Sequence, residues 1–521
     1  MTETIACTAP PDVVRKTKTL NVPLNRVEGD LEIRVALEDG RVADAWSAGT
    51  MYRGIENMLV GRGALDGLVI TPRVCGICTT AHLTAAAKAL DAISGAQLPP
   101  DAVRIRNVAL MTELVQSDVR QPVLMFMADF AGAWHAEEPL HAEAVRRYAP
   151  LKGETAMEVI RETKKVIEIV AILGGQWPHS SYMVPGGVVT LPNAADLQQC
   201  RQLLASYRAW YERRILGCSL ERWQAVASAA DLEAWLAEST AHRDSDLGFF
   251  IRYGRQLGLE QIGGGYGNFL SFGGLDLPAG TAVSPWVAGQ AGLLPAGYAD
   301  GNGVQPFAQE LVSEHVAHSW FMDYAGGRHP FEGETRPYAT GGEGTKYSWA
   351  KAPRYSGQPA EVGPLAEMII AGRPLFADLV RRNGPNALVR VLARLVRPAE
   401  LFEPLACWLR EIEVDGTYYV SAGQIGAGRG CGLTEATRGA LGHWVEIADG
   451  RIQRYQIITP TAWNGSPRDA GDVRGPWEEA LVGTPVRDPA SPVELGYVVR
   501  SFDPCLVCTV HTVRVRPGRG G

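Results

Sequence analysis

Two short segments near opposite ends of the chain decide how the protein must fold. They read Arg73-Val74-Cys75-Gly76-Ile77-Cys78-Thr79-Thr80-Ala81-His82 and Asp503-Pro504-Cys505-Leu506-Val507-Cys508-Thr509-Val510-His511. Each has two cysteines separated by two residues, so both thiols can face one centre from a single turn, and each has a histidine shortly after the second cysteine. Four thiolates and two imidazoles form a set of soft ligands. The fold must therefore bring the chain ends together to close one site.

The composition is that of a soluble globular protein. Of the 521 residues, 46% are hydrophobic and 21% are charged, as in average soluble domains. The net charge of -7 argues against nucleic acid as a partner, because nucleic acid requires a basic surface. No apolar stretch reaches the roughly 18 residues of a transmembrane helix, and no signal peptide is readable. We expect a soluble cytoplasmic chain with no transmembrane segment of its own.

The nine cysteines indicate reduced thiols rather than disulfides, because the count is odd and no export signal is present. Outside the two pairs, five are scattered along the chain: Cys7, Cys200, Cys218, Cys407 and Cys431. They lack the spacing of an iron–sulfur cluster. These five cysteines therefore predict no iron–sulfur cluster within this chain, and so no electron-transfer route.

The pattern along the chain predicts an α+β fold that is mainly helical, with a long central helical bundle and small antiparallel sheets near both chain ends. Apolar and polar residues alternate on both sides of Asp39-Gly40 and again around Asp449-Gly450, which is a strong hairpin signal. Amphipathic helices are expected over 154–173, 196–216 and 386–413. No repeat or linker divides the chain, so the lobes are expected to interlock.

The glycine-rich segment 423–432 has five glycines in ten residues. A nucleotide-binding loop is one reading, but it lacks the strand–loop–helix context and the phosphate-loop lysine. We expect instead a tight turn that packs under the second sheet.

The paired cysteines alone leave three readings. A structural zinc site with four cysteines is one, although local zinc ribbons close over shorter distances and need no histidine behind each pair. A redox dithiol would explain one pair but not two matched pairs. A metal site with soft ligands uses all four thiols together with the two histidines.

At these residues the chain resembles the large, catalytic subunit of nickel–iron hydrogenases. The resemblance extends over nearly the whole chain. It includes Arg26-Val27-Glu28-Gly29, Arg53-Gly54-Ile55-Glu56, the segment Lys346 to Tyr355, Glu435-Ala436-Thr437-Arg438-Gly439 and Pro460-Thr461-Ala462-Trp463-Asn464. The family's fold and activity are therefore expected here.

The resemblance implies a nickel–iron centre. Cys75 and Cys505 would be terminal ligands of nickel, and Cys78 and Cys508 would bridge nickel and iron. The iron would carry carbon monoxide and cyanide ligands. The resemblance also implies roles for four residues around the metals. Arg438 and Thr461 would hold a cyanide nitrogen, and Asp503 would orient Arg438. His82 would hydrogen-bond a bridging thiolate.

A magnesium ion is also implied by the resemblance. Glu56, His511 and the Ile457 carbonyl would be its direct ligands, and Glu314 and Lys351 would bind its waters, because Mg²⁺ prefers oxygen ligands and retains water. The histidines His135, His141, His179 and His329 receive no role.

The function implied is heterolytic oxidation of H2 to protons and electrons. Cys505 would accept the proton, Glu28 would relay it, and Arg438 would stabilise charge over the pocket. The electrons would pass to an iron–sulfur small subunit. The resulting heterodimers could associate into higher oligomers. A hydrogen-sensing regulatory subunit is the alternative.

Departures from the family pattern favour one branch. Asp30 stands where relatives commonly have a histidine, and Thr437 stands where many have a proline. At Gln116-Ser117-Asp118, relatives carry histidines or an aspartate that pairs with the active-site arginine. Either Ser117 or Asp118 could take that place. Together these features favour the cytoplasmic uptake branch (cyanobacterial-like, group 2), with membrane association only through a partner.

The chain divides into a body and a tail. Residues 1–511 would form the large subunit, and 512–521 a Gly/Arg-rich tail that a maturation endopeptidase removes after metal-insertion factors have loaded nickel. Because the family's sensors lack a tail, its presence favours the enzyme.

Overall fold

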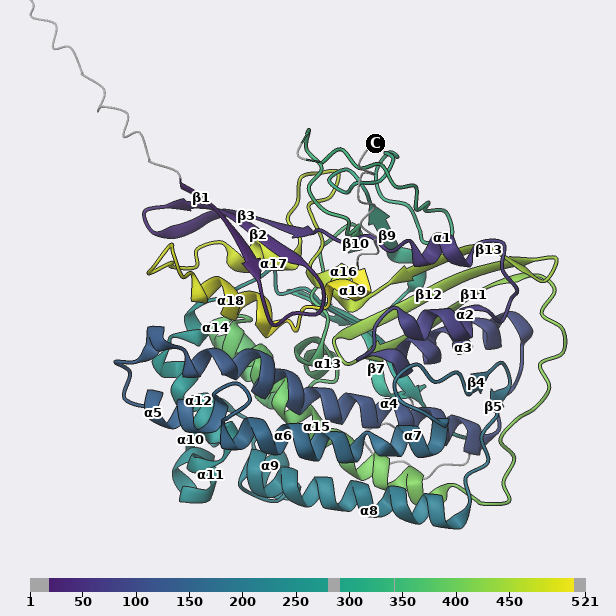
Figure 1. The fold of residues 1–521 in the computed structure, drawn as a ribbon, viewed down its shortest axis with the longest axis horizontal. Coiled ribbons are helices and arrows are strands. Elements are labelled where there is room, and N and C mark those ends of the chain that lie inside the picture. Colours follow the sequence, from purple (N-terminus) through teal and green to yellow (C-terminus); the bar gives the residue numbers. More distant parts are fainter. Residues whose placement is uncertain (1–17, 280–290, 342, 510–521) are drawn as a thin grey trace, which may run out of the picture.

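The computed structural model describes residues 18–279, 291–341 and 343–509, with the side chains of Cys508 and Thr509 left out. In the view of Figure 1 the long helices form a layer in the lower half, and the small sheets lie above it. The last helix, α19 (Leu506–Thr509), lies between the N-terminal and the C-terminal sheet. The prediction of a mainly helical α+β fold with small antiparallel sheets near both ends is confirmed. No described helix is both long and apolar enough to cross a membrane.

The N-terminal sheet contains β1 (Lys18–Leu24), β2 (Leu31–Glu38) and β3 (Arg41–Gly49) in antiparallel order. Asp39 and Gly40 take left-handed backbone angles in the predicted turn, and alternate residues of β2 are buried. The C-terminal region packs onto this sheet, because Val42 exchanges backbone hydrogen bonds with Gly483 and Thr484. The two ends of the chain are thus joined outside the site as well.

The C-terminal sheet contains β11 (Gly428–Ala436), β12 (Gly439–Ala448) and β13 (Arg451–Ile458), again antiparallel. Asp449-Gly450 forms the predicted hairpin turn. The expectation for the glycine run 423–432 was wrong in part, because its second half is strand β11 itself rather than a turn beneath the sheet. The glycines let β11 approach α3 (Thr79–Ser94): a Cβ on Gly432 would lie 1.8 Å from the Ala85 carbonyl oxygen.

The helical layer is built around α4 (Pro100–Gln121) and α15 (Ala387–Glu411), with α6 (Glu154–Val166), α7 (Glu168–Gly174) and α8 (Ala194–Tyr211) beside them. The helix expected over 154–173 is divided at Ile167. The one expected over 196–216 ends in a wide turn, Glu212–Leu216. The pattern did not reveal α4, because it is buried on nearly all sides and its polar residues, such as Glu113 and Asp118, are buried together with the apolar ones.

A third sheet was not predicted from the sequence. It contains β6 (Phe269–Asp276), β7 (Gly292–Asp300) and β8 (Gly303–Gln305) and follows α12 in the chain. The other described helices are α1 (Ile55–Leu59), α2 (Gly67–Ile70), α5 (His141–Tyr148), α9 (Leu220–Gln224), α10 (Ala229–Glu238), α11 (Thr240–Asp244), α12 (Asp246–Gln256), α13 (Pro364–Ile370), α14 (Pro374–Asn383), α16 (Pro460–Asn464), α17 (Pro476–Leu481) and α18 (Val493–Ser501). Two strand pairs complete the fold: β4 (Met183–Val184) with β5 (Gly187–Val188), and β9 (Val312–His315) with β10 (Ala352–Tyr355).

Candidate metal centre

The two cysteine motifs lie together in the interior. Cys78 directly precedes α3, so the first pair lies on the turn that leads into this helix, whereas Cys505 directly precedes α19 and Cys508 lies within it. The sulfur atoms of Cys75 and Cys505 are 3.5 Å apart although the residues are 430 positions apart in sequence. Cys75, Cys78 and Cys505 are at most 3% exposed. The Cys508 side chain and His511 lie outside the described part of the chain.

The backbone around Glu28 holds the second motif in place. The Glu28 carbonyl accepts hydrogen bonds from the amides of Leu506 and Val507, and the Glu28 amide donates to Pro504. Gly29 is needed beside it: its φ is +89°, and a Cβ there would lie 2.8 Å from the Val507 nitrogen. The backbone of Glu28 is thereby paired with that of Cys505.

Arg53 joins the two motifs directly. Its guanidinium donates to the carbonyl oxygens of Val74, in the first motif, and Val507, in the second. A third hydrogen bond, of 3.3 Å, runs to the Arg73 carbonyl. The sequence indicated Arg53 only as part of a family segment, because the contact depends on residues that are distant in sequence.

Arg438 and Asp503 form a buried ion pair beside the thiols. A terminal nitrogen of Arg438 lies 3.0 Å from Asp503 Oδ1, and its Nε donates to the Asp503 carbonyl at 3.0 Å. The hydroxyl of Thr461 accepts from the Cys505 amide at 3.1 Å. These three predicted residues thus gather around Cys505.

The electrostatics of this pair differ from those of exposed groups. Burial lowers the pKa of Arg438, but Asp503 and the sulfurs of Cys505, Cys75 and Cys78 raise it well above the ordinary value, so the guanidinium stays charged. Burial raises the pKa of Glu28, against the lowering effect of Arg438. A fixed cation and a carboxyl able to hold a proton therefore face the same small space.

That space is a cavity of about 30 Å³ lined by Glu28, Ile77, Ser117, Arg438 and Asp503 among others. It has room for roughly one or two water molecules, so a very small molecule fits in it. Ser117 lies at this cavity, whereas Asp118 pairs with Arg394 and Arg397 instead of Arg438. Of the two open alternatives, it is therefore Ser117 that faces Arg438.

His82 is fully buried and neutral. Its Nδ1 lies 3.1 Å from His443 Nε2, and His443 Nδ1 lies 3.0 Å from the Tyr455 hydroxyl. Burial lowers the pKa of His82 to about 4. His82 Nε2 has no hydrogen-bond partner among the described residues, which leaves it available to a bound group. His179 contributes too: its ring lies against Gly76 and bonds to the Pro72 carbonyl, a role that sequence reasoning missed along with that of His443.

Glu56 lies in a second buried cluster. Its Oε1 accepts from the Ile457 amide at 2.9 Å, and its Oε2 accepts from the Thr335 hydroxyl. Lys351 lies 3.8 Å from Glu56 and 3.6 Å from Glu314. Burial raises the pKa of Glu314 to about 7, with Lys351 lowering it and Glu56 raising it. Two buried carboxylates thus share one ammonium group.

No three histidine, cysteine, aspartate or glutamate side chains within the described ranges meet closely enough to hold a metal ion. The predicted ligand sets each include a member outside those ranges, Cys508 for the thiol site and His511 for the Glu56 cluster.

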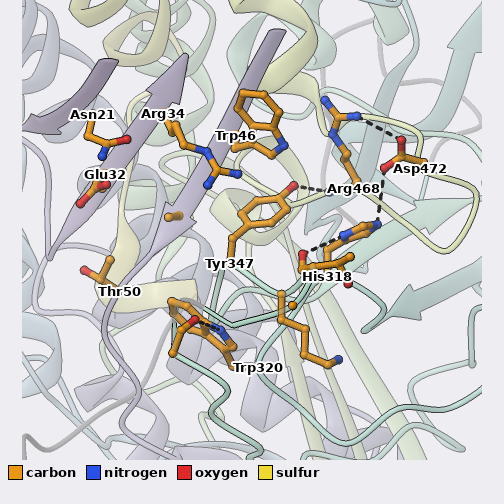
Figure 2. Close-up of a pocket in the computed structure, with 15 residues that line it drawn as sticks. Asn21, Glu32, Arg34, Trp46, Thr50, His318, Trp320, Tyr347, Arg468 and Asp472 are labelled. Carbon is orange, nitrogen blue, oxygen red and sulfur yellow. Dashed lines mark hydrogen bonds and ion pairs between the residues drawn. The ribbon is translucent and has the colours of Figure 1, made fainter. Parts of the chain in front are cut away.

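A larger hollow lies elsewhere, on the N-terminal sheet (Figure 2). It measures about 610 Å³ and is lined by aromatic and basic side chains. The guanidinium of Arg34 stacks 4.5 Å from the Trp46 ring centroid, and Arg468 and His318 both pair with Asp472. None of the predicted site residues lines it, so the chemistry is assigned to the thiols.

The fold and this site define a class before any comparison is made. Buried thiols from both ends of an interlocked chain, with a fixed cation and a cavity for a very small molecule, indicate a metalloenzyme with soft sulfur ligands. The model of the family "Nickel-dependent hydrogenase" matches residues 53–124 and 252–511.

Related proteins match along the whole chain. The periplasmic NiFeSe hydrogenase large subunit of Desulfomicrobium baculatum is 33% identical, with 98% of each chain covered. The hydrogenase-2 large chain of Escherichia coli (strain K12) is 29% identical, with 94% of this chain and 96% of the relative covered. The solved structure of the reduced Ni-Fe-Se hydrogenase from D. vulgaris Hildenborough has a TM-score of 0.79 at 29% identity and covers 95% of this chain and 100% of that chain.

The chain belongs to the nickel-dependent hydrogenase family. It is an oxidoreductase, the large subunit of a hydrogenase that oxidises H2 at a nickel–iron centre.

Proposed function

We propose that this chain splits H2 heterolytically at a nickel–iron group held by the thiolates of Cys75, Cys78, Cys505 and Cys508. All four thiolates would hold the nickel, and those of Cys78 and Cys508 would also hold the iron. The observation that carries the proposal is the 3.5 Å separation of the Cys75 and Cys505 sulfurs in a buried pocket. Soft, polarisable thiolates suit a nickel ion that changes oxidation state.

The surrounding residues fit this group. Carbon monoxide and cyanide would complete the coordination of the iron. Arg438 and the Thr461 hydroxyl would donate hydrogen bonds to a cyanide nitrogen. His82 offers its unpaired Nε2 to a thiolate, a contact that orients ligands and tunes a metal. When bound, the group supplies the site at which H2 is cleaved and takes up two electrons.

The chain's own residues then handle the proton. The Cys505 sulfur accepts it, and the carboxylate of Glu28 relays it away. Glu28 is suited to this step because its backbone is bonded to the second motif and its pKa is raised by burial, which moves a carboxyl toward the working pH. Arg438 meanwhile supplies fixed positive charge in a dry site, where electrostatic stabilisation is strong.

A magnesium ion occupies the second cluster in this proposal. Glu56, the Ile457 carbonyl and His511 are its ligands, and Glu314 and Lys351 bind its waters. Support comes from the closeness of two buried carboxylates, Glu56 and Glu314, whose mutual repulsion a cation would relieve.

The electrons leave through an iron–sulfur small subunit. A docking surface is suggested by four exposed apolar side chains on the segment that leads into the first motif: Met58, Val60, Leu65 and Val69. Grouped exposed apolar residues mark protein interfaces. Heterodimers formed in this way can associate into larger oligomers.

We place the protein in the cytoplasmic uptake branch (group 2), bound to the membrane only through a partner, on the basis of Asp30, Thr437 and Gln116-Ser117-Asp118. Residues 1–511 act as one unit. A maturation endopeptidase removes 512–521 once insertion factors have loaded the metal, so the intact mass of active protein should end at His511. A fully active chain that still ends at Gly521 would contradict this.

The metal assignment is tested with single cysteine variants. Cys75→Ser and Cys505→Ser should lose nickel, measured by elemental analysis, together with hydrogen oxidation, because each removes one of four thiolates. Cys431→Ser is the matched control, since that thiol lies on β11 outside the motifs, and it should keep both. Full nickel content in the first two variants would rule the site out.

A further inference from the structure

A layer of buried charge lies behind Arg438. Two arginines of α15, Arg394 and Arg397, are 2% and 1% exposed. Arg394 lies 3.2 Å from Asp503 Oδ2, while Arg438 holds Oδ1 of the same carboxylate at 3.0 Å. Asp503 therefore lies between two guanidinium groups, of which only Arg438 lines the active-site cavity. Its contact with Arg394 is an ion pair without hydrogen-bond geometry.

The backbone that carries Arg438 is held from the same side. Arg394 donates to the carbonyl oxygen of Thr437 at 2.7 Å, and Arg397 donates to it at 3.1 Å. Thr437 directly precedes Arg438, so this contact limits rotation of the peptide from which the Arg438 side chain extends. Arg394 thus contacts both the carboxylate and the peptide that orient Arg438.

The two arginines of α15 nevertheless have different partners. Arg397 holds Asp118 with two hydrogen bonds, of 2.7 and 2.8 Å, and reaches Glu367 at 2.6 Å. Arg394 lies 3.4 Å from Asp118. Arg397 is thus shared between Asp118 and Glu367. Both arginines donate to the Thr437 carbonyl, but of the two only Arg394 contacts Asp503.

We propose that Arg394 is a positioning residue of the hydrogen reaction, and that it acts through Asp503 by fixing the carboxylate that holds Arg438 beside the thiols. The proposal rests on the function proposed above. A carboxylate that faces a cation at each oxygen turns less freely about its own side-chain bond than one that faces a single cation. Charge that is fixed in advance is what stabilises a transition state in a dry site. Arg394 itself touches no reacting atom.

The alternative is that Arg394 only ties α15 to α4, as Arg397 does through Asp118. Arg394→Lys and Arg397→Lys form a matched pair that separates the two roles. Each keeps the positive charge but loses the planar fork of donors. Only the first disturbs the contact with Asp503.

The experiment uses the assembled enzyme with its small subunit. Nickel per chain, kcat and KM for H2 with a redox dye, and the infrared bands of the iron-bound cyanide are measured for each variant. Arg394→Lys should lower kcat per nickel by about 10-fold or more, the scale of a lost outer-shell partner, with an unchanged KM and shifted cyanide bands. Arg397→Lys loses a contact with the Thr437 carbonyl but none with Asp503, so it should lower kcat less than Arg394→Lys does.

A double variant tests the route through Asp503. In the Asp503→Asn background, Arg394→Lys should add less than about a 2-fold loss, because residues that act through one another are not additive. Equal losses in the two lysine variants, an undiminished loss in the Asp503→Asn background, or loss of nickel from Arg394→Lys alone would overturn the inference. A wild-type enzyme without nickel or cyanide bands would instead overturn the proposed function.

Discussion

The role of Arg53 as a tie between the two motifs can be tested by removing its guanidinium. Arg53→Met keeps most of the length and apolar stem of the side chain but loses the hydrogen bonds to Val74 and Val507. Hydrogen bonds from a charged donor contribute about 1.5–3 kcal/mol each, so two of them contribute about 3 kcal/mol or more. The second motif should therefore open far more often than in the wild-type protein.

The assay is hydrogen–deuterium exchange of the segment that contains Leu506 and Val507. Exchange there should accelerate by about 100-fold, since each 1.4 kcal/mol of local opening free energy corresponds to a factor of about ten. Arg73→Met is the control, because Arg73 is exposed and its guanidinium donates to the nearby Val69 carbonyl. Equal protection of the second motif in the two variants would refute the role given to Arg53.

Three further outcomes are expected. Glu28→Gln should keep nickel but lower dye-coupled turnover by about 100-fold, because an amide cannot carry a proton; near-normal turnover in a nickel-replete variant would remove Glu28 from the proton route. Burial raises the pKa of Glu478 from 4.5 to about 7, so its contribution to stability is complete below about pH 4.5 and is lost as the pH rises through about 7. In the wild-type protein the free energy of unfolding should therefore fall between about pH 5 and pH 8, and Glu478→Gln should make that fall smaller by roughly 3 kcal/mol. Urea unfolding at the two pH values measures it, and an equal fall in both proteins would contradict the role given to Glu478. Leu65→Asp should reduce co-purification of the small subunit, whereas Val304→Asp, on the exposed strand β8, should not; equal recovery would remove the proposed surface.

Local patterns in the sequence were sufficient for the two chain-end hairpins and for the longest helix, α15. The Asp39-Gly40 and Asp449-Gly450 hairpins and the helix α15 all lie where alternation or a 3.6-residue period placed them. By contrast, α4 and β6 are buried along almost their whole length. In α4, buried polar residues such as Glu113 and Asp118 interrupt the apolar pattern, so its position depends on tertiary packing.

The candidate site shows the same limit. Short-range spacing revealed both cysteine pairs and the residues beside them. It could not reveal Arg53, His443 or Arg394, because each acts through a partner from a distant part of the chain. Glu113 is a similar case: it accepts the amides of Thr80 and Ala81 at the start of α3, and nothing in its own neighbourhood in the sequence indicates this.

The separation of the two motifs has a consequence for synthesis on the ribosome. Cys75 and Cys505 are 430 positions apart, and translation adds about 5–20 residues per second, so the first pair of thiols waits roughly 20–90 s for the second. During that time Cys75 and Cys78 are nascent thiols without their metal-binding partners. The centre therefore cannot form cotranslationally, and the cell must keep the first pair reduced until the last helix of the chain has emerged.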